Sequence, residues 1–400
     1  MNVQQLRSDT PGCRERIHLN NAGAALMPEP VIRTIHDHLA LESRIGGYEA
    51  AEACQAAIED AYQAVARLVG APARNIAFTE NATAATMQAL SSIPFVRDDV
   101  ILTTRNDYVS NQIQYLALGA RLGVRVVRAP DLPVPGGGVD VQAMAELIER
   151  HHPRLVAVTH IPTNSGLVQD VAAVGAVCRQ EGITYLVDAC QSVGQTPIDV
   201  TELGCDFLAA SARKFLRGPR GVGFLYVSDR GLDQGFEPLF IDMRGAEWIA
   251  PDRYRAASDA TRFENWESPW ALVRATGEAA RYAADIGLPA ISDRVRALAR
   301  RLRESFAPDG TIRVLDRGAE LSAIVSLAVD GWDPVDLVGA LRERHVNTSA
   351  QHRAYAVIDC DTKGVTTSLR LSPHYYNTED EIDQAVAVLH ELVPRRGRGR

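Results

Sequence analysis

The stretch Phe207-Leu-Ala-Ala-Ser-Ala-Arg-Lys214 decides the fold, together with the turn Gly218-Pro-Arg-Gly-Val-Gly223 that follows it. An apolar strand ends here in a hydroxyl, an arginine and a lysine. Lysines are usually solvated surface charges, so Lys214 alone indicates little. A second apolar stretch, Leu186-Val-Asp-Ala-Cys-Gln191, ends in an acid upstream of the lysine. Two polar strand ends of this kind predict one buried site.

Short apolar segments alternate with helical segments on both sides of this stretch. The expected strands lie at 76–78, 100–103, 124–128, 155–159, 185–187, 207–210 and 222–227. The expected helices between them include 82–90, 111–122, 141–150 and 171–180. Strands that are apolar on both faces and separated by helices predict a mostly parallel sheet covered on both sides. The fold class is therefore α/β.

The flanking regions predict a second, smaller unit. Residues 1–17 are polar, helices are expected at 28–41 and up to Gly70, and Gly46-Gly47 permits a sharp turn between them. A long helical pattern at 270–306 leads to strands at 312–315, 323–329 and 368–371, and Thr378-Glu-Asp-Glu381 is a capping box. We expect an arm at 1–17, a large domain at 18–268, and a small C-terminal domain at 269–400 to which the arm contributes.

Composition excludes several classes of function. The chain has 400 residues, 46% hydrophobic content and a net charge of -8, which argues against a general nucleic-acid binder. We interpret the basic tail at 394–400 as a frayed, solvated end. The six cysteines form no C-x-x-C pair, no signal peptide opens the chain, and no apolar run approaches the ~20 residues of a membrane span. These features predict a cytoplasmic protein without a metal site.

Polar motifs fall at five of the expected strand ends, where ligands bind in parallel sheets. They are Thr79-Glu-Asn-Ala-Thr83, Asn106-Asp-Tyr108, Asn164-Ser-Gly166, Asp188 and Lys214. A lysine can hold a carbonyl cofactor as a Schiff base, and an aspartate can pair with a pyridinium nitrogen. The motifs predict a site for pyridoxal 5′-phosphate (PLP). Taken alone, Asp188 fits a helix cap equally well.

Phosphate binding needs backbone N–H groups at a helix start together with hydroxyls or cations. Ala82 and Thr83 supply the first kind, and Ser211 and Arg213 supply the second. An ordinary cap by Asn81 or Thr83 is the alternative and does not exclude phosphate.

Three further side chains complete the predicted site. Gln191 would reach the phenolic oxygen of the cofactor ring, and Tyr108 would lie on the face of the ring, although an aromatic at a strand end is also typical of a core. Arg370 is an arginine inside an apolar strand, which suits a substrate α-carboxylate or a structural salt bridge.

The chain resembles the class V, fold-type I PLP-dependent enzymes: cysteine desulfurases, cysteine C–S lyases and isopenicillin N epimerase-like proteins. The resemblance runs from His18-Leu-Asn-Asn-Ala-Gly23 through the Asp188 and Lys214 motifs to Tyr375-Tyr-Asn-Thr-Glu-Asp-Glu-Ile382. It implies that Lys214 carries the cofactor, that Asn164 lies near the substrate and the ring oxygen, and that Arg370 binds the carboxylate. It also implies a homodimer with active sites at the interface, to which residues 263–267 would be lent.

Two departures separate this sequence from desulfurases. Thr348-Ser-Ala-Gln-His-Arg-Ala354 has Arg353 about where desulfurases carry a persulfide-forming cysteine, and Cys360 is displaced. Arg353 would bind a second substrate carboxylate or face solvent. Desulfurases also stack a histidine where Tyr108 stands here. The stretch 42–52 is similar to hercynylcysteine sulfoxide lyases.

Several functions share these motifs. The preferred hypothesis is a C–S lyase that converts a cysteine-derived amino acid or its sulfoxide to pyruvate and ammonia by β-elimination. An aminotransferase or an epimerase would begin with the same proton abstraction, so the motifs do not separate them. A desulfurase and a PLP-binding protein without catalysis are the remaining alternatives, and the full set of Lys214, Asp188 and Arg370 disfavours the last.

Overall fold

The central feature is a seven-stranded sheet, and it confirms the predicted α/β class. The computed structural model describes residues 1–133, 137–306 and 310–393, so the basic tail lies outside the described residues. The strands are β2 (Ile76–Thr79), β3 (Val100–Thr103), β4 (Arg125–Arg128), β5 (Leu155–Thr159), β6 (Tyr185–Asp188), β7 (Phe207–Ser211) and β8 (Gly223–Val227). Their order is β2-β8-β7-β6-β5-β3-β4. β8 pairs antiparallel with both neighbours and the other pairs are parallel.

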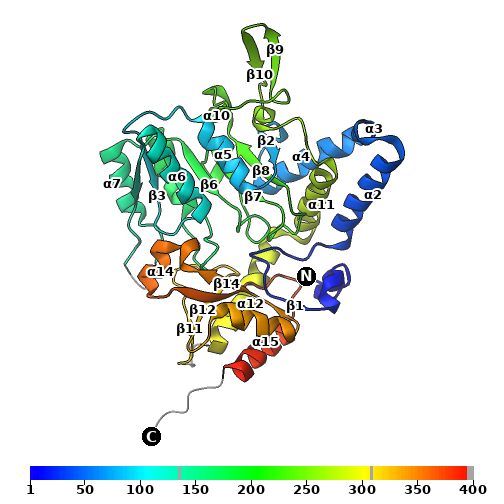
Figure 1. Cartoon of the computed structure of the whole chain (residues 1–400), viewed down its shortest axis with the longest axis vertical. Helices are drawn as coiled ribbons and strands as arrows, with labels where there is room; N and C mark the ends of the chain where they lie inside the picture. The colour runs from blue at the N-terminus through cyan, green and yellow to red at the C-terminus, as the bar shows by residue number, and fades with distance from the viewer. Residues whose placement is uncertain (134–136, 307–309, 394–400) are drawn as a thin grey trace.

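Both faces of this sheet are buried, as the sequence pattern predicts. Along β5, Val156 and Val158 pack into one hydrophobic cluster, while Leu155 and Ala157 pack into another on the opposite face. The helices of this unit are α5 (Ala82–Ser92), α6 (Val109–Leu122), α7 (Val141–His151), α8 (Val171–Gln180), α9 (Val200–Leu203) and α10 (Asp229–Asp233), with short turns η2 (Ala73–Asn75) and η3 (Ala260–Phe263). Alternating side chains therefore anchor helices on each side (Figure 1).

A helical layer flanks the sheet. It contains α2 (Glu29–Ile45), α3 (Gly47–Ala53), α4 (Gln55–Val69) and α11 (Trp270–Ile286), and α11 packs against both α2 and α4. The expected turn lies at Gly46, whose φ is 100°. The helical pattern at 270–306 forms two helices, not one, because Gly287 has a φ of 92° and separates α11 from α12 (Leu288–Phe306).

The second unit is an antiparallel sheet with the order β11-β12-β15-β14. Its strands are β11 (Ile312–Val314), β12 (Val325–Val329), β14 (Ser349–His352) and β15 (Thr367–Leu371), and its helices besides α12 are α13 (Pro334–Glu343), α14 (Val357–Lys363) and α15 (Glu379–Leu392), with η4 (Arg353–Tyr355) after β14. The capping box at Thr378 and Glu381 is present. Sequence reasoning missed β14, because Ser-Ala-Gln-His carries no apolar alternation.

The N-terminal arm is more ordered than its polar composition suggested. It contains α1 (Val3–Ser8) and η1 (Pro11–Arg14), and β1 (Ile17–His18) pairs in parallel with β13 (Val346–Asn347). The arm is thereby tied to the smaller unit. Within the described residues, no helix is long and apolar enough to cross a membrane.

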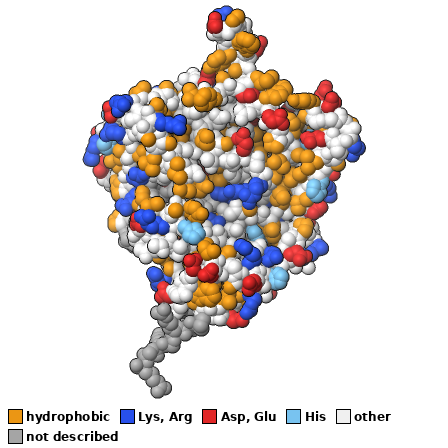
Figure 2. Space-filling view, in the orientation of Figure 1, with side chains coloured by type: hydrophobic (Ala, Val, Ile, Leu, Met, Phe, Trp, Pro, Cys, Tyr) orange, Lys and Arg blue, Asp and Glu red, His pale blue; other side chains and the backbone are white. Residues whose placement is uncertain are grey.

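A hairpin that the sequence did not predict projects from the large unit (Figure 1). It consists of β9 (Ala246–Ala250) and β10 (Arg253–Ala256). On the face drawn in Figure 2, basic side chains gather near the centre, between the two units.

Candidate active site

A cavity of about 250 Å³ lies at the carboxyl ends of β6 and β7 and at the start of α5. Seven of the predicted site residues line it: Ala82, Thr83, Tyr108, Asp188, Ser211, Arg213 and Lys214. Asn164, Gln191, Arg353 and Arg370 do not line this cavity. The strand-end argument thus brings together residues from four separate segments of the chain.

Lys214 stands on the turn after β7 and is only 6% exposed. Its Nζ lies 5.7 Å from the centroid of the Tyr108 ring, which precedes α6. The amine and the aromatic face therefore occupy the same small space. A buried amine of this kind can act as a nucleophile or a base, whereas a surface lysine would stay solvated.

Asp188 ends β6 as a buried carboxylate. Its Oδ1 accepts a hydrogen bond from the backbone N–H of Cys190 (2.9 Å), and its Oδ2 accepts one from Nδ2 of Asn111 (2.9 Å). Burial raises the pKa of Asp188, although the charge of Lys214 opposes the shift. The bond to Cys190 lies in a turn and is not the helix cap considered as an alternative, because the next helix, α9, begins at Val200 and is capped by Asp199.

Sequence reasoning missed the group that supports Asp188. Asn111 also lies 3.3 Å from Asp107 Oδ1, and Asp107 accepts hydrogen bonds from the backbone N–H of Tyr108 (2.7 Å) and the hydroxyl of Thr103 (3.0 Å). Asn111 follows Asp107 by one helical turn, so both side chains share a face of the chain as it enters α6. The four-residue spacing of Asp107 and Asn111 was the feature of the sequence from which this support for Asp188 could have been predicted.

The opposite end of the cavity is a helix start. Asn81 caps α5 by accepting from the N–H of Ala84 (3.0 Å), and Ser211 Oγ accepts from the N–H of Ala82 (3.0 Å). Both the cap and the predicted grouping of Ser211 with α5 are therefore present. Arg213 donates to the carbonyl of Gly23 (2.8 Å), which fixes its guanidinium near the N-terminal segment.

Arg220, from the glycine turn before β8, also lines the cavity and was not predicted as a site residue. It is exposed, whereas most of the other lining residues are partly or fully buried.

Arg370 lies in β15 and is 4% exposed. Its Nη1 donates to both the carbonyl and the hydroxyl of Thr163 (2.8 Å each), and Nη2 donates to Oδ1 of Asn20 (3.1 Å). Burial, together with the charge of Arg213, lowers the pKa of Arg370 to about 10. Its Nε is buried without a partner, and none of the ion pairs among the described residues involves Arg370. The salt-bridge alternative is therefore not realised within the described chain.

Thr163 links Arg370 to Gln191. Gln191 Nε2 donates to Thr163 Oγ1 (2.8 Å) and to the carbonyl of Ala22 (3.0 Å), while its Oε1 is buried without a partner. Asn164, the neighbouring residue, instead donates through Nδ2 to Asp359 Oδ2 (2.7 Å). The structure therefore places Thr163, and not Asn164, against Arg370 and Gln191.

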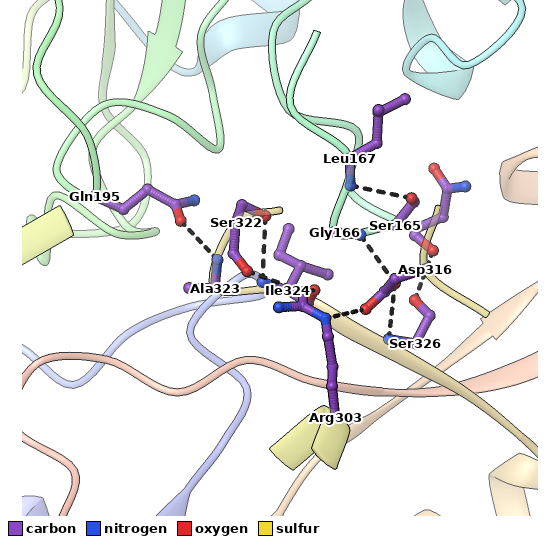
Figure 3. A network of polar contacts seen from close by, with 11 residues as sticks. Ser165, Gly166, Leu167, Gln195, Arg303, Asp316, Ser322, Ala323, Ile324 and Ser326 are labelled. Carbon is purple, nitrogen blue, oxygen red and sulfur yellow. Dashed lines mark hydrogen bonds and ion pairs between the residues drawn. The ribbon is translucent and has the colours of Figure 1, made fainter. Parts of the chain in front are cut away.

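The loop that carries Thr163 is held by the smaller unit (Figure 3). The backbone N–H of Gly166 donates to Asp316 Oδ1 (3.0 Å), and Arg303 Nε donates to Asp316 Oδ2 (2.9 Å). A Cβ on Gly166 would lie 2.5 Å from the carbonyl oxygen of Ile324, so only glycine fits this approach. The buried ion pair thus fixes the loop at close range.

The segment where desulfurases carry their cysteine forms β14, η4 and α14. Arg353 is exposed and makes a two-point contact with Asp361 (Nε–Oδ1 2.5 Å, Nη2–Oδ2 2.7 Å). Cys360 lies within α14, is 6% exposed, and has a pKa raised by burial. A buried thiol with a raised pKa is a poor nucleophile.

Comparison with known proteins shows what the chain is similar to. The family model described as aminotransferase class-V matches residues 17–385. A probable cysteine desulfurase of Methanothermobacter thermautotrophicus is 28% identical over 402 residues, which cover 98% of each chain. The apo structure of a cysteine desulfurase from Thermococcus onnurineus NA1 superposes with a TM-score of 0.89 at 27% identity and covers 98% of both chains.

A structure of the cystine C–S lyase C-DES with its reaction product, cysteine persulfide, shares the fold. Its TM-score is 0.85 at 23% identity, with 96% of this chain and 99% of that chain covered.

The residues around the cavity fit pyridoxal 5′-phosphate. Asp188 is a buried carboxylate suited to a pyridinium N–H, and α5 opens beside Ser211 and Arg213, as an anion site requires. Lys214 also lines this cavity. The donor set thus matches a ring nitrogen, an aldehyde carbon and a phosphate.

Proposed function

The chain belongs to the class-V aminotransferase family of PLP-dependent enzymes, and on that premise we propose that it is a C–S lyase. Its substrate would be a cysteine-derived amino acid or its sulfoxide, from which a sulfur substituent leaves Cβ. The burial of Cys360 inside α14 is the observation that carries this choice within the sulfur-handling members of the fold. Without an accessible thiol on that segment, sulfur would leave with the departing group.

Arg370 would bind the substrate α-carboxylate. Thr163 and Asn20 already orient its guanidinium, and the unpartnered Nε leaves a donor for a carboxylate oxygen. A planar guanidinium pairs with a carboxylate through two hydrogen bonds, which also fixes the direction of the substrate Cα.

Lys214 and Asp188 would then handle protons at two defined atoms. PLP, when bound, draws electron density away from the substrate Cα. Lys214 Nζ takes the Cα proton as general base, while Asp188 holds a proton at the pyridine nitrogen. Tyr108 aligns the reacting plane against the amine. The sulfur group leaves Cβ with the bonding electron pair, and one water completes the conversion to pyruvate and ammonium.

A second copy of the chain would complete the site. Leu239, Phe240 and Met243 are 70%, 83% and 68% exposed, and they lie in the segment between α10 and the β9–β10 hairpin. Apolar side chains of this size are typical of an interface when they cluster. The six free cysteines suit a reducing compartment such as the cytoplasm.

A cysteine desulfurase is the second candidate, because the sequence relative described above carries that name. That reaction would convert L-cysteine to alanine and pass its sulfur to an acceptor thiol. The products separate the two candidates, since a lyase yields pyruvate and a desulfurase yields alanine.

The decisive experiment supplies PLP-loaded protein with S-substituted cysteines and their sulfoxides and, in parallel, with L-cysteine and an acceptor thiol, in each case without a keto-acid acceptor. Many turnovers of pyruvate and ammonia support the lyase. Alanine with persulfide indicates a desulfurase, and a single half-turnover that leaves the amine form of the cofactor indicates an aminotransferase. Solvent deuterium at Cα without pyruvate indicates an epimerase. Any of these last three results rejects the proposal.

Lys214→Ala is the matched loss-of-function variant. We expect turnover to fall by at least about a thousandfold, because the nucleophile and base are both removed. The thermal midpoint of the variant, followed by circular dichroism, checks that the fold survives. Activity near that of the parent protein would contradict the assignment of Lys214.

A further inference from the structure

Asp359 in α14 joins the smaller unit to two loops of the large sheet. Its Oδ1 accepts from Asn106 Nδ2 (3.3 Å), and its Oδ2 accepts from Asn164 Nδ2 (2.7 Å) and from Lys363 Nζ (2.7 Å). Asp359 and Lys363 are one helical turn apart, and the Lys363 side chain is only 4% exposed. One carboxylate thus receives donors from three segments of the chain.

The two loops that Asp359 holds both lead into the candidate active site. Asn106 lies in the loop after β3, two residues before Tyr108, whose ring faces Lys214. Asn164 lies after β5 and directly follows Thr163, which contacts Arg370 and Gln191. A shift of Asp359 would therefore move the aromatic face and the carboxylate site together.

The buried Lys363 makes the charge of Asp359 necessary. Among the described residues, the ion-pair partner of Lys363 is Asp359. Removing one partner of a buried ion pair leaves the other charge uncompensated. Asn106 and Asn164 would lose an acceptor at the same time. This loss would weaken the packing of α14 against the loops of the large sheet. The side chains of Asp359, Lys363, Asn106 and Asn164 all lie at that contact.

We propose that Asp359 is a positioning residue that locks α14 onto the Tyr108 and Thr163 loops and so sets the substrate-binding geometry. This role rests on the proposed PLP site, and it holds for any reaction that begins with amino-acid binding there. In this chain the segment that desulfurases use for a thiol serves as a fixed clamp.

The test measures binding without elimination. PLP-loaded parent protein and Asp359→Asn are titrated with glycine and L-alanine, which have no leaving group at Cβ, and the change in cofactor absorbance reports binding. We expect Asp359→Asn to weaken binding of both amino acids about tenfold, which corresponds to the loss of a charge-assisted hydrogen bond. Asp361→Asn, from the exposed Arg353 pair on the same helix, is the control and should bind like the parent.

A double variant separates positioning from stability. Asp359→Asn with Lys363→Met removes the unpaired charge, so its thermal midpoint should recover toward that of the parent while amino-acid binding stays weak. Recovery of both properties, or parent-like binding by Asp359→Asn, would overturn the positioning role. Failure to form pyruvate from any cysteine derivative rejects the lyase alone, because glycine binding does not depend on elimination.

Discussion

Two buried charged residues of the proposed site, Asp188 and Arg370, take part in none of the ion pairs among the described residues. Arg370 keeps a buried Nε without a partner. Burial raises the pKa of Asp188 and lowers the pKa of Arg370, and both shifts favour the neutral form of the side chain. Such arrangements are costly unless a ligand supplies the missing partner. The pyridinium of PLP would supply a positive partner for Asp188, and an amino-acid carboxylate would supply a negative partner for Arg370.

Ser211 provides a test of the phosphate end of the cavity. We expect Ser211→Ala to raise the dissociation constant for PLP about tenfold, because one hydroxyl to a charged phosphate is lost along with the acceptor for the Ala82 N–H. Titration of the apo protein with PLP, followed by fluorescence, measures this. Ser92→Ala, whose hydroxyl donates to the Ala89 carbonyl at the other end of α5, is the control. Equal dissociation constants for the two variants would remove Ser211 from the phosphate site.

His160 predicts how stability depends on pH. Burial lowers its pKa from 6.5 to about 4, with the charge of Arg296 adding to the shift, and Nδ1 is buried without a partner. Below pH 6.5 the His160 imidazole binds a proton in the unfolded chain but stays neutral in the native chain until the pH approaches 4. Stability is therefore lost as pH falls from 6.5 to about 4, by roughly 3 kcal/mol in total.

Replacing His160 should remove that contribution. His160→Asn should show a smaller fall in thermal midpoint between pH 7 and pH 5 than the parent protein. His36→Asn, on the exposed side of α2, should keep the parent's fall. Parallel curves for the parent and His160→Asn would show that another group governs the acid limb.

At the scale of elements, sequence periodicity predicted what depends on burial and missed what depends on local turns. All seven large-sheet strands lie within a residue or two of their predicted limits. Six of them are almost entirely buried, and the edge strand β4 keeps two valines between its arginines. The break between α11 and α12 went unseen, since Gly287 sits inside a continuous helical pattern. The β9–β10 hairpin was missed because its exposed strands carry no pattern set by burial.

The same distinction applies to the candidate site. Strand ends and helix starts brought seven predicted residues to one cavity, because parallel strands meet at a common edge. The contact of Thr163 with Arg370 and Gln191 depends on the course of a loop, which has no sequence period from which it could be predicted. Asp359 was not predicted either, because its partners Asn106 and Asn164 are distant in sequence.

Gly287 tests the break between α11 and α12. We expect Gly287→Ala to destabilise the protein by about 1 kcal/mol, because its φ of 92° suits glycine and strains an alanine. No atom lies within 4 Å of the added Cβ, so a steric clash would not contribute. Gly339→Ala, inside α13 and equally uncrowded, should instead be neutral or stabilising. Urea unfolding of both variants provides the comparison. A loss of stability in Gly339→Ala as large as in Gly287→Ala would show that backbone conformation is not the cause.

At the scale of the whole molecule, the β9–β10 hairpin and the segment before it expose large apolar side chains. Two strands alone are marginally stable in water, yet Trp248 on β9 is 80% exposed and Phe240 nearby is 83% exposed. Hydrophobic side chains are visible along this projection in Figure 2. A second copy of the chain would bury them and, in the proposed dimer, bring its segment toward the neighbouring active site.

Phe240→Asp tests this assembly. We expect the parent protein to sediment as a dimer and Phe240→Asp to shift toward monomer by at least about tenfold in dissociation constant, because a charge would be buried in an apolar contact. Val335→Asp, at an exposed position of α13 in the smaller unit, should leave the dimer intact. If active sites lie at the interface, lyase turnover should fall as the monomer fraction rises. It should recover at high protein concentration, where the dimer re-forms. A parent protein that sediments as a monomer with full activity would reject both the dimer and the shared site.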